Sequence, residues 1–254
     1  AGAPGICECD GGLITNRKQG AWDWRTAMTD RNRVIFDIET IGHPFEELGS
    51  DVQEFLLRYA DTDEKKQQAR DGTALSAITG EIVAIALLDP DTDKGGVYFQ
   101  APDSQLEEWL EDGVRHVPET EAGLLDRFWQ TVANYGQIVT FNGRGFDAPF
   151  IYLRSMVHEI KATTNLMPNR YYPDRHLDLQ DQLKFYGANR MRFDFHVLCR
   201  MLGIESPKDA GVAGGDVPEL FSQGEYETIA RYCLRDVQAT QAVLAKWDRV
   251  FGAE

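Results

Sequence analysis

The segment from residue 33 to 39, Arg-Val-Ile-Phe-Asp-Ile-Glu, constrains this chain most, because it is strongly apolar and yet carries two carboxylates. Alternate side chains of a strand share a face, so Asp37 and Glu39 would point the same way as Ile35. We expect a buried, central strand here. Two like charges held so close need a cation, a metal ion or a shared proton. The alternative for such a short pattern is a strand that has simply reached solvent.

The rest of the chain predicts a mixed α/β sheet. Strands are expected at 80–88, 96–100, 137–141 and 175–179, and helices at 45–60, 120–135, 146–158, 194–202 and 225–251. The polar run 61–72 is typical of a solvated loop. Strands in succession, followed by strands that alternate with helices, indicate a five-stranded sheet flanked by helices. Residues 1–30 show no periodicity and predict a leader, disordered or added, ahead of a single domain over 31–254.

Composition excludes several classes of protein. The longest apolar run, 82–88, has seven residues and is too short to cross a bilayer. Four cysteines are too few and too scattered for a disulfide framework, and no CxxC pair indicates a zinc site. We therefore expect a cytoplasmic protein with reduced thiols and no membrane partner.

The charge is acidic and uneven. A net charge of −15 argues against a broad basic face for nucleic acid, but bound divalent cations would reverse the local field. Residues 141–200 carry nine Lys and Arg against six Asp and Glu, a net of +3, which leaves −18 for the rest. This segment could line a groove for a single strand, although the alternative is that its side chains are merely solvated or in the core. The candidates are Arg144, Arg154, Arg170, Arg175, Arg190, Arg192, Tyr171, Tyr172, Phe185, Tyr186 and Phe193.

Other acidic residues lie near the ends of expected strands or on expected helices, and they are further candidates for catalysis or metal binding. Asp147 follows a strand and a Gly-containing loop, near a helix N-terminus, where an ordinary capping aspartate is the alternative. Tyr232 and Asp236 are four residues apart on an expected helix and share a face, with a chance surface pair as the alternative. His176 and Asp178 are expected to have hydrogen-bonded structural roles. Three carboxylates at strand ends or loops, and a fourth on a later helix, suit a phosphodiesterase with two metal ions.

The four acids in this order resemble the DEDD superfamily of 3′–5′ exonucleases, which has an RNase H-like fold. Asp37 and Glu39 resemble its first motif, Asp147 its second, and Asp236 its third. Tyr232, four residues before Asp236, is similar to the tyrosine (DEDDy) subgroup. The segments 140–147 and 215–233 resemble the proofreading domain of family B DNA polymerases, and 215–233 is especially similar to the related stand-alone bacterial PolB-like exonucleases. The resemblance covers about residues 33–250.

The resemblance implies a reaction and a set of roles. Asp37, Glu39, Asp147 and Asp236 would bind two Mg²⁺ or Mn²⁺ ions, and Tyr232 would orient the attacking water. Cleavage at the 3′ end of single-stranded DNA or RNA, with DNA favoured, would release 5′-mononucleotides. The residues expected near the terminal nucleotide are Ile38, Thr40, Ile41, Asn142 and Phe146. An exoribonuclease or oligoribonuclease on the same scaffold and a non-catalytic nucleic-acid-binding module are the alternatives.

Overall fold

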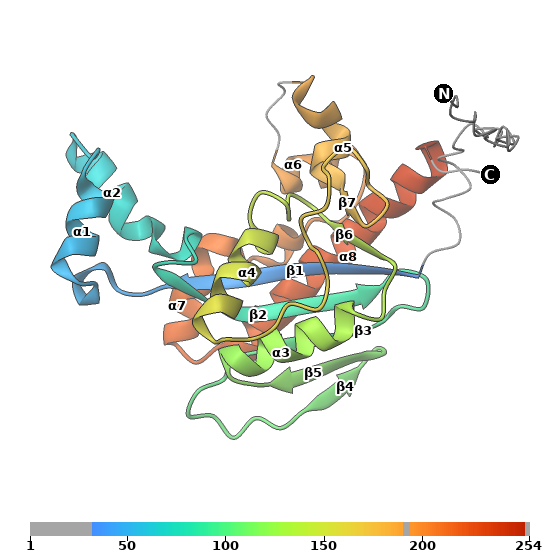
Figure 1. Ribbon diagram of the computed structural model, residues 1–254. Helices are drawn as coiled ribbons and strands as arrows, with labels where there is room; N and C mark the ends of the chain where they lie inside the picture. The colour runs from blue at the N-terminus through green and yellow to red at the C-terminus, as the bar shows by residue number, and fades with distance from the viewer. Residues whose placement is uncertain (1–31, 190–193, 252–254) are drawn as a thin grey trace, which may run out of the picture.

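The computed structural model describes residues 32–189 and 194–251, which form a mixed sheet with helices on both faces (Figure 1). Its seven strands lie in the order β4-β5-β3-β2-β1-β6-β7. The strands are β1 (Arg33–Gly42), β2 (Gly80–Asp89), β3 (Lys94–Phe99), β4 (Trp109–Glu111), β5 (Val114–Pro118), β6 (Gln137–Thr140) and β7 (His176–Asp178). The pairs β1–β6, β6–β7 and β3–β5 are parallel, and the others are antiparallel.

Helices cover the sheet unequally. One face carries α3 (Glu121–Val132) and α4 (Asp147–Val157), and the long α8 (Tyr226–Phe251) lies behind the other (Figure 1). The remaining α-helices are α1 (Ser50–Leu57), α2 (Asp63–Asp71), α5 (Leu179–Leu183), α6 (Phe195–Met201) and α7 (Val217–Ser222). Short 3₁₀ turns are η1 (Phe45–Glu47), η2 (Gly72–Leu75), η3 (Phe185–Gly187), η4 (Pro207–Ala210) and η5 (Gly214–Asp216).

Strand β1 separates two hydrophobic cores. Val34, Phe36 and Ile38 pack in the core beneath α3 and α4, whereas Ile35 packs in the core beneath α8. This alternation is the one expected from the sequence. It directs the side chains after Ile35 on its own face, including Asp37, toward α8.

The sheet is larger than the expected five strands, because the β4–β5 hairpin was missed. Its turn is Asp112-Gly113, with φ of 47° and 84°. Both left-handed residues are typical of the tight turn that an Asp-Gly pair favours, so this dipeptide was the available signal. The flanking strands have only 3 and 5 residues, which is too short for a clear alternation of apolar and polar side chains.

The expected loop at 61–72 is wrong in part, since α2 occupies most of it. Thr62 caps this helix by accepting a hydrogen bond from the backbone N–H of Lys65. Neither α1 nor α2 contains a buried residue, so α2 has no apolar stripe from which it could be recognised. The helix expected at 45–60 is interrupted before Ser50, where Gly49 caps α1. The other expected helices and strands form within a few residues of their predicted ends.

Residues 1–31, where the leader is expected, lie outside the described residues. Within the described residues, Cys199 and Cys233 are buried and unpaired, as expected for reduced thiols. In the same ranges, no helix has both the length and the apolar character that a membrane crossing requires.

Candidate metal and catalytic site

Asp147 is hydrogen-bonded to the middle of β1. Strand β6 runs beside β1 only at residues 33–35, and the chain then turns away into the loop before α4. Further along β1, the backbone N–H of Ile38 donates a hydrogen bond of 3.1 Å to Asp147 Oδ1. Asp147 is buried. The Asp147 carboxylate therefore accepts a backbone hydrogen bond that a neighbouring strand would otherwise accept. It lies next to the part of β1 that carries Asp37 and Glu39.

The loop at 141–146 has a shape that few sequences could adopt. Asn142 has a left-handed backbone with φ of 66°. A Cβ atom on Gly143 would lie 2.6 Å from the side chain of Thr140, so only glycine fits there. Asp178 accepts hydrogen bonds from the backbone N–H groups of Asn142, at 3.0 Å, and Arg144, at 2.9 Å. These constraints set where α4 begins and thus where Asp147 lies.

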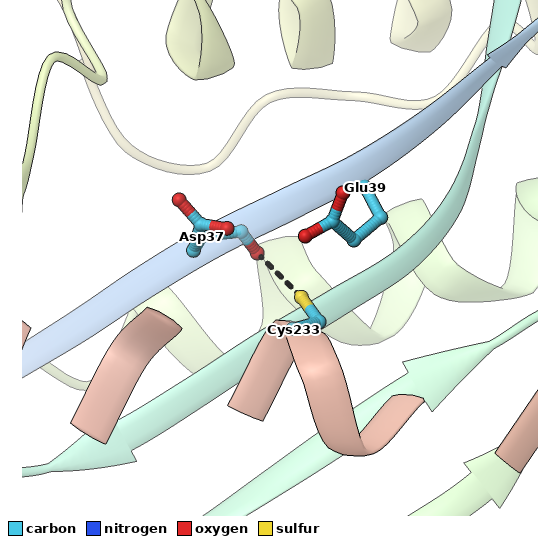
Figure 2. A group of neighbouring side chains, drawn as sticks. All are labelled: Asp37, Glu39 and Cys233. Atoms are coloured by element: carbon cyan, nitrogen blue, oxygen red, sulfur yellow. Dashed lines mark hydrogen bonds between the residues drawn. The ribbon is translucent and has the colours of Figure 1, made fainter. Parts of the chain in front are cut away.

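Helix α8 lies against the same part of β1, on the face of the sheet opposite α3 and α4 (Figure 1). Ligand atoms of Asp37, Glu39 and Cys233 lie within 4.8 Å of one another. Figure 2 shows the two carboxylates on β1 beside the thiol of α8, which donates a hydrogen bond of 3.5 Å to the backbone carbonyl of Asp37. Tyr232 is buried, and its hydroxyl faces Asp236, one turn later on α8, closely enough to lower the pKa of that carboxylate.

Asp37, Glu39, Asp147 and Asp236, here named the acid cluster, act on one another electrostatically. Burial raises the pKa of Asp37 and of Glu39 well above the ordinary range, and repulsion from the other acids adds to this. Burial also raises the pKa of Asp147 to about 7 and that of Asp236 to about 7. For Asp236 the hydrogen bond from Tyr232 opposes the increase. Four acids from three separate segments therefore share one electrostatic site, in which a cation would relieve the repulsion.

The two other polar groups of α8 stay protonated. Burial, followed by the charges of Asp236 and Glu39, raises the pKa of the Tyr232 hydroxyl far above its usual value. Burial and the charge of Asp37 raise the pKa of the Cys233 thiol. Tyr232 is thus a hydrogen-bond donor. Cys233 is a neutral thiol that contacts β1, a role that sequence reasoning missed although the residue lies three positions before Asp236 on the same helix.

The five residues expected near a terminal nucleotide differ in how far their side chains are buried. Thr40 is buried and donates its hydroxyl hydrogen to a backbone carbonyl of η2 at 2.7 Å. Ile38 is a core residue, and Ile41 is half-buried against the core beneath α8. Asn142 is exposed, and Phe146 is half-buried against α4. Asn142 and Phe146 therefore offer side-chain surface next to Asp147, whereas the side chain of Ile38 does not.

Two of the arginines expected in a nucleic-acid groove are internal. Arg154 is buried and donates two hydrogen bonds to Glu121, at 2.8 and 2.6 Å, so its expected contact with phosphate is wrong. The Arg144 guanidinium, with 9% of its side chain exposed, bonds to the backbone carbonyl of Pro168. Arg190, Arg192 and Phe193 lie outside the described residues.

His176 and Asp178 have the structural roles expected of them. The His176 ring bonds to the Thr140 hydroxyl at 2.8 Å and to the Leu166 carbonyl at 2.7 Å. Asp178 accepts N–H groups from the loop before α4 and also caps α5. No sequence pattern indicated that this aspartate holds the loop that carries Asp147.

Comparisons with known proteins identify a family for this chain. Residues 82–253 match the family described as "Predicted 3′-5′ exonuclease related to the exonuclease domain of PolB". The match begins within β2, so it includes Asp147, Tyr232 and Asp236 but not Asp37 and Glu39.

Relatives of the chain include archaeal polymerases. The chain is 32% identical over 168 residues to DNA polymerase 1 of Sulfolobus acidocaldarius, and 24% identical over 169 residues to that of Sulfurisphaera ohwakuensis. Each alignment covers 63% of this chain and 19% of the polymerase. The family B DNA polymerase of Pyrobaculum calidifontis superposes with a TM-score of 0.55 at 15% identity, over 85% of this chain and 24% of the polymerase.

The structural likeness confirms the RNase H-like α/β fold. The chain spans about a fifth of the polymerases that it matches, so it corresponds to a part of them. With two thirds of its length in the family match, the chain belongs to the family of predicted 3′–5′ exonucleases related to the exonuclease domain of PolB.

Proposed function

We propose that this chain is a metal-dependent 3′–5′ exonuclease, which removes 5′-mononucleotides from the 3′ end of single-stranded nucleic acid, with DNA favoured. The observation that carries the proposal is the acid cluster, in which the charges of Asp147, at the start of α4, and Asp236, in the middle of α8, raise the pKa of Asp37 and Glu39 on β1. Membership of the PolB-related family supports the reaction class. The preference for DNA rests on relatives that are DNA polymerases.

The donor set of the cluster fits hard divalent cations. Carboxylate oxygens are the ligands that Mg²⁺ and Mn²⁺ prefer. In the proposal, Asp37, Glu39, Asp147 and Asp236 hold two such ions. The thiol of Cys233 is protonated, which makes it a poor ligand for these metals. When bound, the ions would lower the pKa of a water molecule and neutralise charge on the scissile phosphate.

The side chains around the ions would have separate tasks. Ile38 N–H occupies one oxygen of Asp147 and fixes the orientation of that carboxylate. Tyr232 keeps its proton, so its hydroxyl can donate a hydrogen bond to Asp236 and help to orient the attacking water. With this role for Tyr232, the chain would belong to the tyrosine subgroup. Asn142 and Phe146, beside Asp147, are proposed to contact the terminal nucleotide.

A degradation assay with end-labelled strands tests the proposal. Single-stranded DNA and RNA of equal sequence, labelled at the 5′ end, should shorten stepwise from the 3′ end with Mg²⁺ or Mn²⁺, the DNA faster. A 3′ label should be released at once as a mononucleotide, and EDTA should stop both reactions. Faster loss of RNA would indicate an exoribonuclease. Binding without any shortening of either strand would contradict the proposal and favour a non-catalytic binding module.

A further inference from the structure

Several aromatic side chains in the segment between α4 and α6 are exposed rather than buried. Tyr171, Tyr172 and Phe185 are 66%, 59% and 59% exposed, and Tyr186 is half-buried. These four residues are named the aromatic patch. The rings of Tyr171 and Tyr186 lie with their centroids 5.1 Å apart and their planes inclined by 58°. Large aromatic side chains normally contribute to a core, so a group of them at the surface indicates a contact surface.

The turn that carries half of this patch is strained. Phe185, Tyr186 and Gly187 are consecutive and all left-handed, with φ of 48°, 54° and 93°. This conformation is unfavourable for bulky residues, because their Cβ atom comes close to the following carbonyl oxygen. Gln182 holds Tyr186 in place with a hydrogen bond of 2.7 Å to its hydroxyl oxygen. Strain of this kind persists where the neighbouring structure specifies it, and it is often found at binding sites.

The part of the sequence that carries the patch is less acidic than the rest of the chain. The patch lies within residues 141–200, which carry a net charge of +3 while the rest of the chain carries −18. Arg170, next to Tyr171, has 52% of its side chain exposed and is anchored by Asp181 on α5. Arg175 is also exposed. Exposed aromatic rings beside arginines are the combination that binds single-stranded nucleic acid, whose bases stack while its phosphates meet the guanidinium groups.

The patch is connected to the acid cluster through one loop. Arg170 bonds to Asp181 of α5, and Asp178 at the start of α5 holds the loop that ends at Asp147. In Figure 1, α5 lies above β7, beside the end of β6 from which this loop leaves. A strand whose 3′ end lies among the carboxylates could therefore continue over α5.

We propose that the aromatic patch binds single-stranded nucleic acid upstream of the 3′ end, with bases stacked on Tyr171 and Tyr186 and phosphates near Arg170 and Arg175. The inference rests on the proposed function, because it assigns a path to the strand that the acid cluster would cut. It names a binding site separate from the acids, so the two can be tested independently.

Binding of a fluorescent 12-nucleotide strand, measured by anisotropy in EDTA so that no hydrolysis occurs, tests this site. Tyr171→Ala should raise the Kd by at least about fivefold for DNA and RNA alike, since stacking is worth about 1–3 kcal/mol per base and tolerates either sugar. Tyr171→Phe, which keeps the ring, should bind within twofold of the unmodified protein. The matched control is Tyr59→Ala, because Tyr59 is 82% exposed in the turn after α1, away from the patch.

A length series gives a result that mere loss of folding would not produce. Affinity should increase from 3 to 12 nucleotides in the unmodified protein, and much less in Tyr171→Ala. Equal affinity of Tyr171→Ala/Tyr186→Ala and unmodified protein for the 12-mer would overturn the inference, as would equal binding of a duplex. Stepwise shortening of DNA would then still support the exonuclease. Conversely, a patch-dependent Kd without any hydrolysis would refute the exonuclease and support the patch.

Discussion

Each residue of the acid cluster is costly for the fold in the absence of a cation. Burial raises the pKa of Asp236 to about 7, and only part of that increase is offset by the hydrogen bond from Tyr232. A core of this kind would be more stable with neutral side chains. In the proposed function, the four acids would serve cation binding and not folding.

The variant Asp236→Asn separates the effect of this side chain on metal binding from its effect on folding. The amide keeps the size of the side chain and an oxygen that can accept from Tyr232, but it removes a charge. We expect nuclease activity to fall by at least about a hundredfold, since loss of a direct ligand should exceed the 10–100-fold cost of an outer-shell change. The melting temperature without metal should not fall. Asp51→Asn on the exposed side of α1 is the control, and equal activity of both variants would remove Asp236 from the mechanism.

Tyr232→Phe tests the hydroxyl alone. The ring stays buried, so folding should be preserved, while the hydroxyl that faces Asp236 and is proposed to orient the attacking water is lost. We expect kcat to fall roughly a hundredfold, within the range of a lost acid–base contact. The Mg²⁺ concentration for half-maximal rate should stay within about threefold, since the phenol is not a metal ligand. An unaltered kcat would exclude the tyrosine from catalysis.

At the scale of elements, the loop between β6 and α4 determines the geometry of the site. Gly143→Ala would force a Cβ atom to within 2.6 Å of Thr140 and so displace the start of α4. Overpacking of this kind destabilises by about 1–3 kcal/mol, and activity should fall further because Asp147 shifts with the helix. Urea denaturation and the end-label assay measure both effects. Gly72→Ala, with open space around its Cβ, is the control and should unfold like the parent.

Elements with a clear hydrophobic pattern could be predicted from the sequence. Strand β1, with Asp37 and Glu39 on the face of Ile35, follows from alternation alone, and α8 follows from its helical spacing. The hairpin at Asp112-Gly113 and the polar helix α2 have no such pattern and were missed. These elements are specified by a turn dipeptide and a cap, which are weaker signals than burial.

Contacts between distant segments could not be predicted from the sequence. The bond from Ile38 N–H to Asp147 joins residues that are 109 positions apart, and Asp178 fixes a loop 34 to 36 positions away. The opposite case is Arg154, which local sequence cannot distinguish from a solvated arginine. Only its position opposite Glu121 in the folded chain makes it part of the core.

At the scale of the whole molecule, the acid cluster links folding to pH and, in the proposed function, to metal binding. Asp147 and Asp236 have a pKa of about 7 when folded and about 3.9 when unfolded. Between those values the folded state binds more protons, so the metal-free protein loses stability as the pH rises toward 7. Above pH 7 Asp147 and Asp236 are mostly deprotonated, and a deprotonated carboxylate is also the form that binds Mg²⁺.

The gain in melting temperature from Mg²⁺ should therefore be larger at pH 8 than at pH 6. At about 100 times the Kd, bound metal contributes about 2.7 kcal/mol, or roughly 5–10 °C for a chain of this size. Protons compete at pH 6 and reduce the gain. Comparison with and without metal at each pH cancels the opposite effect of His176, whose pKa burial lowers.

Two controls separate a specific site from general screening. Because the chain carries a net charge of −15, any salt reduces self-repulsion, so NaCl of equal ionic strength is the reference. Asp236→Asn should lose most of the gain from Mg²⁺ while responding to NaCl like the parent. A gain that is equal at pH 6 and pH 8, or equal in parent and variant, would show that the ions act on the surface charge. In that case the four carboxylates would need another explanation for their burial.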